Sequence, residues 1–139
     1  MELQRVTRGL SHTMTEKFAA PFVLVVDDEG LIRWALRKAL SSCGCDVREA
    51  ADAGAAVRAV TEAEPPFDAV LLDLKLPDSA DLSLLAALRT RLPAARIILM
   101  TAFGTDQTES DALKLGAFRV VRKPFDVKAL AAMAVDWHG

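Results

Sequence analysis

The sequence is organised around one short stretch, VLLDLKLP at residues 70–77. Residues 69–72 form an apolar run with a β-branched valine, which is typical of a strand buried on both faces. The run stops at Asp73, and Pro77 closes the loop that follows. In an open α/β sheet, ligands bind beyond the carboxyl ends of the strands, so Asp73 lies where such a fold places its chemistry. The simpler alternative is an aspartate that only caps the loop.

Outside this stretch, apolar runs and helical patterns alternate along the chain. Apolar residues at 32, 35, 36, 39, 40 and 43, for example, follow the i, i+3, i+4 spacing of an amphipathic helix. The helical pattern at 105–115 is weaker, because its first half has no large apolar residue. Five β–α units in strict alternation predict an α/β fold with a parallel sheet, right-handed crossovers and helices on both faces. The predicted strands are residues 22–26, 46–50, 69–73, 96–101 and 118–122, and the predicted helices are residues 29–43, 53–64, 82–92, 105–115 and 127–134.

Length and composition predict one globular domain of 139 residues. A net charge of −2 and a pI of about 5.7 leave no basic footprint for nucleic acid, and no apolar run approaches the roughly 18 residues of a membrane span. Residues 1–20 carry scattered charge and no apolar signal segment, so we expect a mobile N-terminal extension followed by a folded domain at 21–139. Cys43 and Cys45 have no other cysteine or histidine nearby in sequence, and we interpret them as reduced thiols in a cytosolic protein.

Four of the predicted strands end in residues with reactive or charged side chains. Asp27 and Asp28 follow the first strand, Asp73 the third, Thr101 the fourth and Lys123 the fifth. If the strand order is 2-1-3-4-5, the first and third strands are neighbours and the switch point of the fold lies between them. The sequence therefore predicts one crevice that holds three carboxylates, with a lysine and a hydroxyl beside them.

Three clustered carboxylates raise one another's pKa unless a cation holds them together. Mg²⁺ is the natural cation, because it prefers hard oxygen ligands, and beside a nucleophilic Asp73 it suits phosphoryl transfer. Lys123 would neutralise charge on the phosphoryl oxygens, and Thr101 could donate a hydrogen bond to them. Each residue also has a simpler interpretation: Asp27 and Asp28 as helix caps, Thr101 as a satisfied hydroxyl and Lys123 as a surface lysine.

Taken together, these motifs make the sequence similar to the receiver domains of bacterial two-component response regulators. The resemblance runs from about residue 22 to 137 and implies a flavodoxin-like (βα)5 three-layer sandwich with sheet order 2-1-3-4-5. Receivers of enhancer-binding transcription regulators are the most similar subfamily. The motifs that carry the resemblance are VDDE at 26–29, Asp73 with LPDS at 76–79, DL at 81–82, TAFGT at 101–105 and KPF at 123–125.

The resemblance implies a role for each residue of the predicted crevice. Asp73 would be the phosphoacceptor, and Thr101 and Lys123 would bind the phosphoryl group. Mg²⁺ would be held by Asp28 and Asp73 directly, by Asp27 in its outer sphere and by the backbone carbonyl of Lys75. The resemblance further predicts a cis peptide bond between Lys123 and Pro124, which would turn the lysine back into the crevice.

The function implied is that of a phosphorelay component located in the cytoplasm. Asp73 would take a phosphoryl group from the phosphohistidine of a sensor histidine kinase or phosphotransfer protein, and this would switch a surface that contacts an output domain or partner. A receiver catalyses only its own phosphorylation and dephosphorylation, so no other enzymatic activity is expected. The resemblance also allows a homodimer through the face formed by residues 105–115, 118–122 and 127–134. Direct binding to nucleic acid or membrane is not expected.

Two positions depart from the usual receiver pattern. Val120 stands where receivers commonly have an aromatic residue, whose rotation reports phosphorylation. Phe118 lies two residues earlier on the same face of the strand. Asp81 replaces a glycine common in the loop after the phosphoacceptor. These changes leave the acceptor chemistry intact but bring the usual switch mechanics into question.

The alternatives belong to other functional classes. A receiver-like interaction module that works without phosphorylation is the first, and Val120 favours it while the intact acidic cluster does not. A Mg²⁺-dependent phosphohydrolase would need a second aspartate two residues after the nucleophile, where this chain has Lys75. A flavin-binding protein would need a phosphate loop rich in serine, threonine or glycine, where this chain has acidic residues at 27–29.

Overall fold

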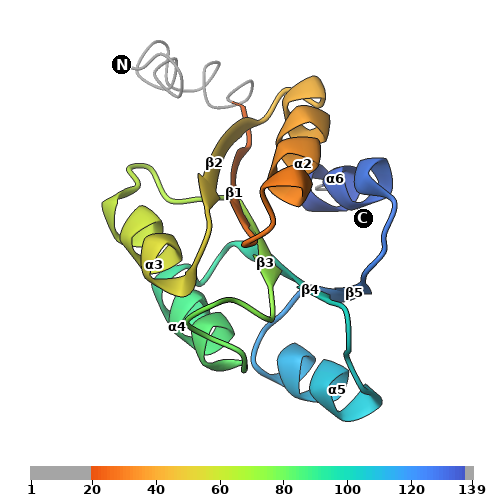
Figure 1. The fold of residues 1–139 in the computed structure, drawn as a ribbon. Coiled ribbons are helices and arrows are strands. Elements are labelled where there is room, and N and C mark those ends of the chain that lie inside the picture. The colour runs from red at the N-terminus through yellow and green to blue at the C-terminus, as the bar shows by residue number, and fades with distance from the viewer. Residues whose placement is uncertain (1–19, 137–139) are drawn as a thin grey trace.

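The computed structural model describes residues 20–136, and in them five strands alternate with five helices as predicted (Figure 1). All four strand pairings are parallel, and the sheet order is β2-β1-β3-β4-β5, which confirms the predicted topology. The elements are β1 (Phe22–Val26), α2 (Gly30–Ser42), β2 (Asp46–Ala50), α3 (Ala53–Glu62), β3 (Ala69–Asp73), α4 (Ser83–Arg91), β4 (Arg96–Thr101), α5 (Asp106–Lys114), β5 (Arg119–Arg122) and α6 (Val127–Val135).

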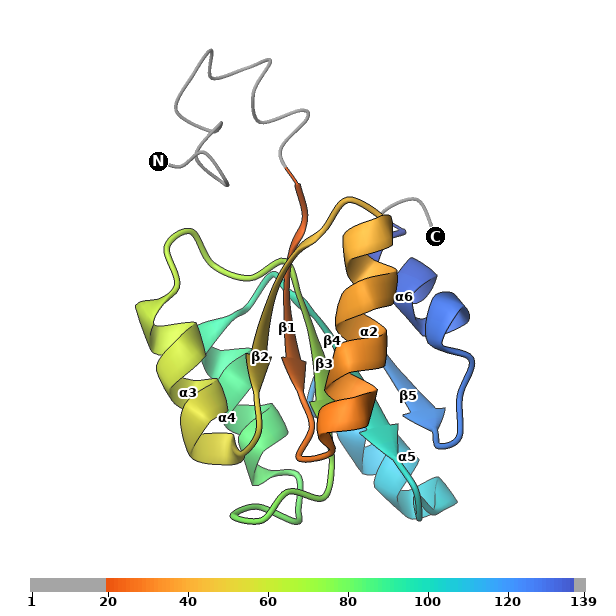
Figure 2. The same cartoon turned by 45° about the horizontal axis from the view of Figure 1, so that its top comes forward.

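The sheet is the middle of three layers, with α2 and α6 on one face and α3, α4 and α5 on the other (Figures 1 and 2). Successive residues of a strand point to opposite faces. In β1, Leu24 therefore packs toward α3 and α4, whereas Val25 packs toward α2 and α6. Both residues are fully buried, which explains why the central strands read as continuous apolar runs rather than as alternating ones.

Helices α3, α5 and α6 each begin at a residue whose side chain binds unpaired N–H groups of the first turn. Asp52 accepts a hydrogen bond from Ala55 N–H (2.7 Å) at the start of α3. Asp126 accepts two at the start of α6, and Thr105 accepts one from Thr108 N–H (3.1 Å) at the start of α5. Asp81, at the position where receivers commonly have glycine, accepts a hydrogen bond from the N–H of Ser83 (2.9 Å), the first residue of α4.

One arginine links α4 to two other segments. The guanidinium of Arg89 donates to the carbonyls of Leu92 (2.9 Å) and Ala95, which precede β4, and to that of Gly116 (3.1 Å), which follows α5. Gly116 has a φ of +105°, and a Cβ at this position would lie 2.5 Å from Cδ of Arg89. Only glycine fits both the backbone conformation and the close approach.

Two further sequence predictions can be compared with the structure. The Lys123–Pro124 peptide bond is cis, as predicted, and so is the Glu64–Pro65 bond. No helix within residues 20–136 is long and apolar enough to cross a membrane. The expected N-terminal extension lies outside the described residues except for Ala20, and stays a prediction.

Candidate functional site

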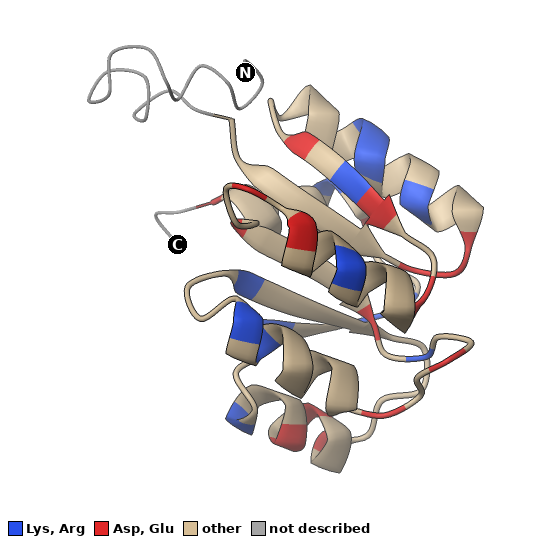
Figure 3. Ribbon diagram, turned by 90° about the vertical axis from the view of Figure 1, so that its left-hand side faces the viewer, with Lys and Arg blue, Asp and Glu red and all other residues tan. Residues whose placement is uncertain are grey.

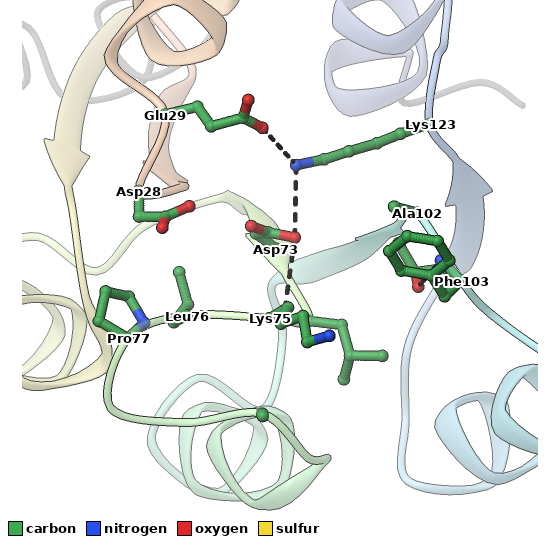
Figure 4. Close-up of a pocket in the computed structure, with 12 residues that line it drawn as sticks. Asp28, Glu29, Asp73, Lys75, Leu76, Pro77, Ala102, Phe103 and Lys123 are labelled. Carbon is green, nitrogen blue, oxygen red and sulfur yellow. Dashed lines mark hydrogen bonds and ion pairs between the residues drawn. The ribbon is translucent and has the colours of Figure 1, made fainter.

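A crevice opens at the carboxyl ends of β1, β3, β4 and β5, where the sequence predicted it (Figure 4). Its volume is about 540 Å³, and acidic residues recur on the loops at this end of the sheet (Figure 3). The topological switch point of the sheet, between β1 and β3, lies at this edge. The residues that line the crevice are Asp28, Glu29, Asp73, Leu74, Lys75, Leu76, Pro77, Ala80, Thr101, Ala102, Phe103 and Lys123.

Three carboxylates meet in this crevice. Asp27, Asp28 and Asp73 each offer an oxygen atom, and these atoms lie within 4.8 Å of one another. Asp27 is completely buried and Asp73 is 5% exposed, whereas Asp28 faces solvent. Clustered oxygen donors of which one is open to water fit Mg²⁺, which binds a few protein oxygens and keeps several waters.

Lys123 reaches the acidic cluster from the end of β5. Its Nζ atom lies 2.8 Å from Oδ2 of Asp27, 3.4 Å from Oδ1 of Asp73 and 3.4 Å from Oε1 of Glu29. Burial alone would lower the pKa of Lys123, but the hydrogen bond to Asp27 and the charges of Asp73 and Asp27 outweigh burial and raise this pKa. Lys123 is therefore a firmly charged ammonium inside the site and no surface lysine.

The carboxyl group of Asp73 is hard to ionise in the metal-free protein. Burial, followed by the charge of Asp27, raises the pKa of Asp73 from its ordinary value of 3.8 to about 6. Lys123 and a 3.4 Å hydrogen bond from Lys75 N–H act in the opposite direction and lower it. Because this pKa lies below 7, the ionised form, which is the nucleophile, predominates at neutral pH.

Thr101 ends β4 with its side chain almost fully buried (3% exposed). Its Oγ1 accepts a hydrogen bond from Phe103 N–H (3.2 Å), which leaves the hydroxyl proton free to donate. The backbone of Gly104 packs directly against the side chain of Thr101, since a Cβ at position 104 would lie 2.7 Å from Cγ2 of Thr101. Phe103 itself is 81% exposed, and Nζ of Lys75 lies 5.5 Å from the centre of its ring.

The interpretation of Asp27 and Asp28 as caps of the following helix does not hold. Glu29 is the residue that precedes α2, and no side chain caps that helix. The Oδ1 atom of Asp27 instead accepts a hydrogen bond from Glu29 N–H (2.9 Å), which orients Oδ2 toward Lys123. Sequence reasoning assigned Glu29 no role, although its position directly after two site aspartates was a signal that its side chain could reach the crevice.

Val120, one of the two departures from the receiver pattern, and the nearby Phe118 lie apart from the acidic cluster. Val120 is half-buried and packs with the core beneath α3, α4 and α5. Phe118 precedes β5, and the centre of its ring lies 4.4 Å from Cζ of Arg96 and 5.4 Å from Cζ of Arg119. The ring of Phe118 therefore contacts arginines at the starts of β4 and β5, far from the carboxyl ends of these strands, where the crevice opens.

Sequence comparison places this chain in a known family. The sequence model of the response regulator receiver domain matches residues 23–135, which is most of the chain. The chain therefore belongs to the response regulator receiver domain family and is a receiver domain of two-component signal transduction. Membership in the family does not favour the alternative of a module that works without phosphorylation.

Curated relatives of this chain include enhancer-binding-type regulators. It is 34% identical over 111 residues to the DNA-binding transcriptional regulator NtrC of Proteus hauseri, and 37% identical over 107 residues to the response regulator protein PilR of Pseudomonas aeruginosa. These matches cover 80% and 77% of this chain but 23% and 24% of the relatives. The chain thus spans about a quarter of the length of the curated relatives it matches.

Solved structures show the same fold. A CheY-like receiver domain protein from Methanospirillum hungatei has a TM-score of 0.77 at 26% identity, and the match covers 83% of this chain and 90% of that one. A response regulator from Burkholderia pseudomallei, solved with a phosphorylated aspartic acid, calcium ion and citrate, has a TM-score of 0.75 at 31% identity over 82% of this chain and 66% of that one. The predicted flavodoxin-like class is confirmed.

Proposed function

We propose that Asp73 accepts a phosphoryl group from the phosphohistidine of a sensor histidine kinase or phosphotransfer protein, with Mg²⁺ bound beside it. The observation that carries this proposal is the convergence of three carboxylates and Lys123 at one switch-point crevice. Three carboxylates held this close repel one another, which destabilises the fold unless a cation binds between them. Such a cost is expected at a site that binds a cation and receives a transferred phosphoryl group.

The transfer step follows from the chemistry of the two groups. An oxygen of the ionised Asp73 attacks phosphorus, the P–N bond of the phosphohistidine breaks, and the imidazole nitrogen leaves with the electron pair and takes up a proton. The product is an acyl phosphate on Asp73. Lys123, already 3.4 Å from Asp73, pairs with a phosphoryl oxygen, and the hydroxyl of Thr101 donates a hydrogen bond to another.

The acidic residues hold the metal in this proposal. Asp28, Asp73 and the carbonyl of Lys75 would bind it directly, and Asp27 would bind through water, since Asp27 is already engaged by Lys123 and by Glu29 N–H. Mg²⁺ supplies, when bound, the positive charge that offsets the carboxylates and the phosphoryl oxygens.

Phosphorylation in the cytoplasm would be transmitted through the surface formed by β4, α5 and β5. Ala112 is the only buried residue of α5, so this helix is held by little apolar contact. Thr101 lies directly before the loop that leads into α5, so a shift of Thr101 toward the phosphoryl group would be passed to that helix through a short loop. An output domain, a separate partner or a second copy bound at α5, β5 and α6 would then sense the change.

Intact mass after incubation with acetyl phosphate and Mg²⁺ tests the proposal. We expect the mass of one added phosphoryl group in the parent, no addition in Asp73→Asn and little addition with EDTA. Asp81→Asn, an exposed aspartate outside the crevice, is the matched control and should label like the parent. Labelling that persists in Asp73→Asn would place the acceptor elsewhere.

A further inference from the structure

A single aspartate joins the loop after Asp73 to the start of another helix. Asp78 lies between β3 and α4, yet its Oδ1 accepts a hydrogen bond from Ala53 N–H (2.7 Å) and its Oδ2 accepts one from Gly54 N–H (3.0 Å). These two hydrogen bonds lower the pKa of Asp78, so the carboxylate remains charged against the positive end of α3. Asp52 binds the third N–H of this helix by itself.

The loop that Asp78 anchors is a tight turn. Leu76 N–H donates to the carbonyl of Ser79 (2.8 Å), and Ser79 N–H donates back to the carbonyl of Leu76 (3.3 Å). The side chain of Leu76 is buried in the core beneath α3 and α4. Asp78 stands inside this turn, so its two hydrogen bonds hold the whole turn against the end of α3.

The turn determines the direction of one carbonyl at the crevice. The C=O of Lys75 and the N–H of Leu76 belong to one planar peptide unit and point in opposite directions. Because Leu76 N–H is bound to Ser79, the carbonyl of Lys75 cannot rotate without breaking the turn. On the other side of Lys75, Leu74 N–H is bound to the carbonyl of Met100 (2.9 Å). The backbone is thus hydrogen-bonded on both sides of Lys75, at Leu74 and at Leu76.

We propose that Asp78 is a positioning residue for the metal site: it holds the turn on α3 and thereby keeps the carbonyl of Lys75 in the orientation that binds the cation. This inference rests on the proposed function, in which that carbonyl is a ligand. Pre-orientation matters because a metal that demands near-octahedral geometry loses affinity when a ligand must be ordered on binding. A purely structural role as a cap of α3 would instead make Asp78 equivalent to Asp52.

The comparison of Asp78→Ala with Asp52→Ala separates these two roles. Both variants remove caps from the same helix, but only the first releases the turn. We expect calorimetric titration with MgCl₂ to show a Kd about tenfold higher in Asp78→Ala, and a Kd within about twofold of the parent in Asp52→Ala. Asp78→Asn keeps one oxygen acceptor, so its Kd for Mg²⁺ should lie between that of the parent and that of Asp78→Ala.

A second measurement needs no metal. Hydrogen exchange of the Leu76 amide in the metal-free protein should accelerate in Asp78→Ala and stay at the parent rate in Asp52→Ala. Equal Mg²⁺ affinities in the two alanine variants, or an unchanged Leu76 amide in Asp78→Ala, would overturn the inference and leave the proposed function intact. A parent that binds no Mg²⁺ would overturn the metal assignment and this inference with it.

Discussion

The ammonium group of Lys123 lies 2.8 Å from Oδ2 of Asp27, whose side chain is completely buried. The two residues directly follow strands β5 and β1, which are separated in the sheet by β3 and β4. The pair therefore spans the crevice and places the same ammonium 3.4 Å from Asp73. A buried pair of this kind contributes little as a pair, but removal of one partner leaves the other charge buried and uncompensated.

We therefore expect Lys123→Met to lower the free energy of unfolding by about 3–5 kcal/mol near neutral pH without Mg²⁺. Urea denaturation followed by circular dichroism measures the change. Lys114→Met, at an exposed position of α5, is the control and should change stability by less than about 0.5 kcal/mol. Equal effects of the two substitutions would show that the ion pair does not compensate the charge of Asp27.

The raised pKa of Asp73 predicts the pH dependence of stability. The folded protein binds this proton with a pKa of about 6 and the unfolded chain with one near 3.8, so the parent loses stability as the pH rises between these values. Asp73→Asn removes this loss. In EDTA, the variant should be about 1–3 kcal/mol more stable than the parent above pH 6, and the difference should vanish below about pH 4. Melting curves across this range provide the test, and a pH-independent difference would contradict it.

Mg²⁺ should stabilise the unphosphorylated protein, because it relieves repulsion among Asp27, Asp28 and Asp73 and binds only the folded state. At a concentration tenfold above its Kd the gain should be about 1.4 kcal/mol. Asp28→Ala should abolish the gain and raise the stability of the metal-free protein. A melting temperature of the parent that is indifferent to millimolar Mg²⁺ would refute this prediction.

Helix α5 should be the least protected helix in hydrogen exchange, since Ala112 is its only buried residue. Thr105→Ala removes the hydrogen bond to Thr108 N–H, which costs about 1 kcal/mol and should speed exchange in α5 about fivefold. Amides of β1 and β3 should exchange at the parent rate and serve as the internal control. Phosphorylation of Asp73 should change protection chiefly in α5, and changes confined to α2 and α6 would place the responsive surface elsewhere.

The elements and the crevice could be predicted from the sequence because both follow from local patterns and topology. The apolar run before Asp73 and the amphipathic pattern from Ile32 to Leu40 each predict their element without reference to other parts of the chain. Strict alternation then makes the sheet parallel, which brings the strand-end residues together at one edge. The amino-acid sequence alone therefore suffices to group Asp27, Asp73 and Lys123.

Contacts between side chains and distant backbone groups could not be predicted in this way. The hydrogen bonds from Ala53 and Gly54 to Asp78 cross a sequence separation of more than 20 residues, and the contact of Arg89 with Gly116 crosses 27. Such contacts depend on how closely two loops approach after the layers have packed. The sequence shows the charged residue, Asp78 in a loop and Arg89 in α4, but contains no periodic signal for its partner.

The hydrogen bonds of Arg89 have a mechanical consequence for α5. They fix the carbonyl of Gly116, just past the last turn of the helix, to α4 and to the segment before β4. The opposite end begins after Thr105, two residues beyond Phe103 of the crevice, and is held by the capping hydrogen bond of Thr105 and by an exposed ion pair between Asp106 and Arg122 (3.7 Å). The C-terminal end of α5 is thus fixed at Gly116, whereas its first turn lies nearer to the site where the phosphoryl group would bind. If Thr101 shifted, the displacement of α5 would be largest in the first turn and would decrease toward Gly116.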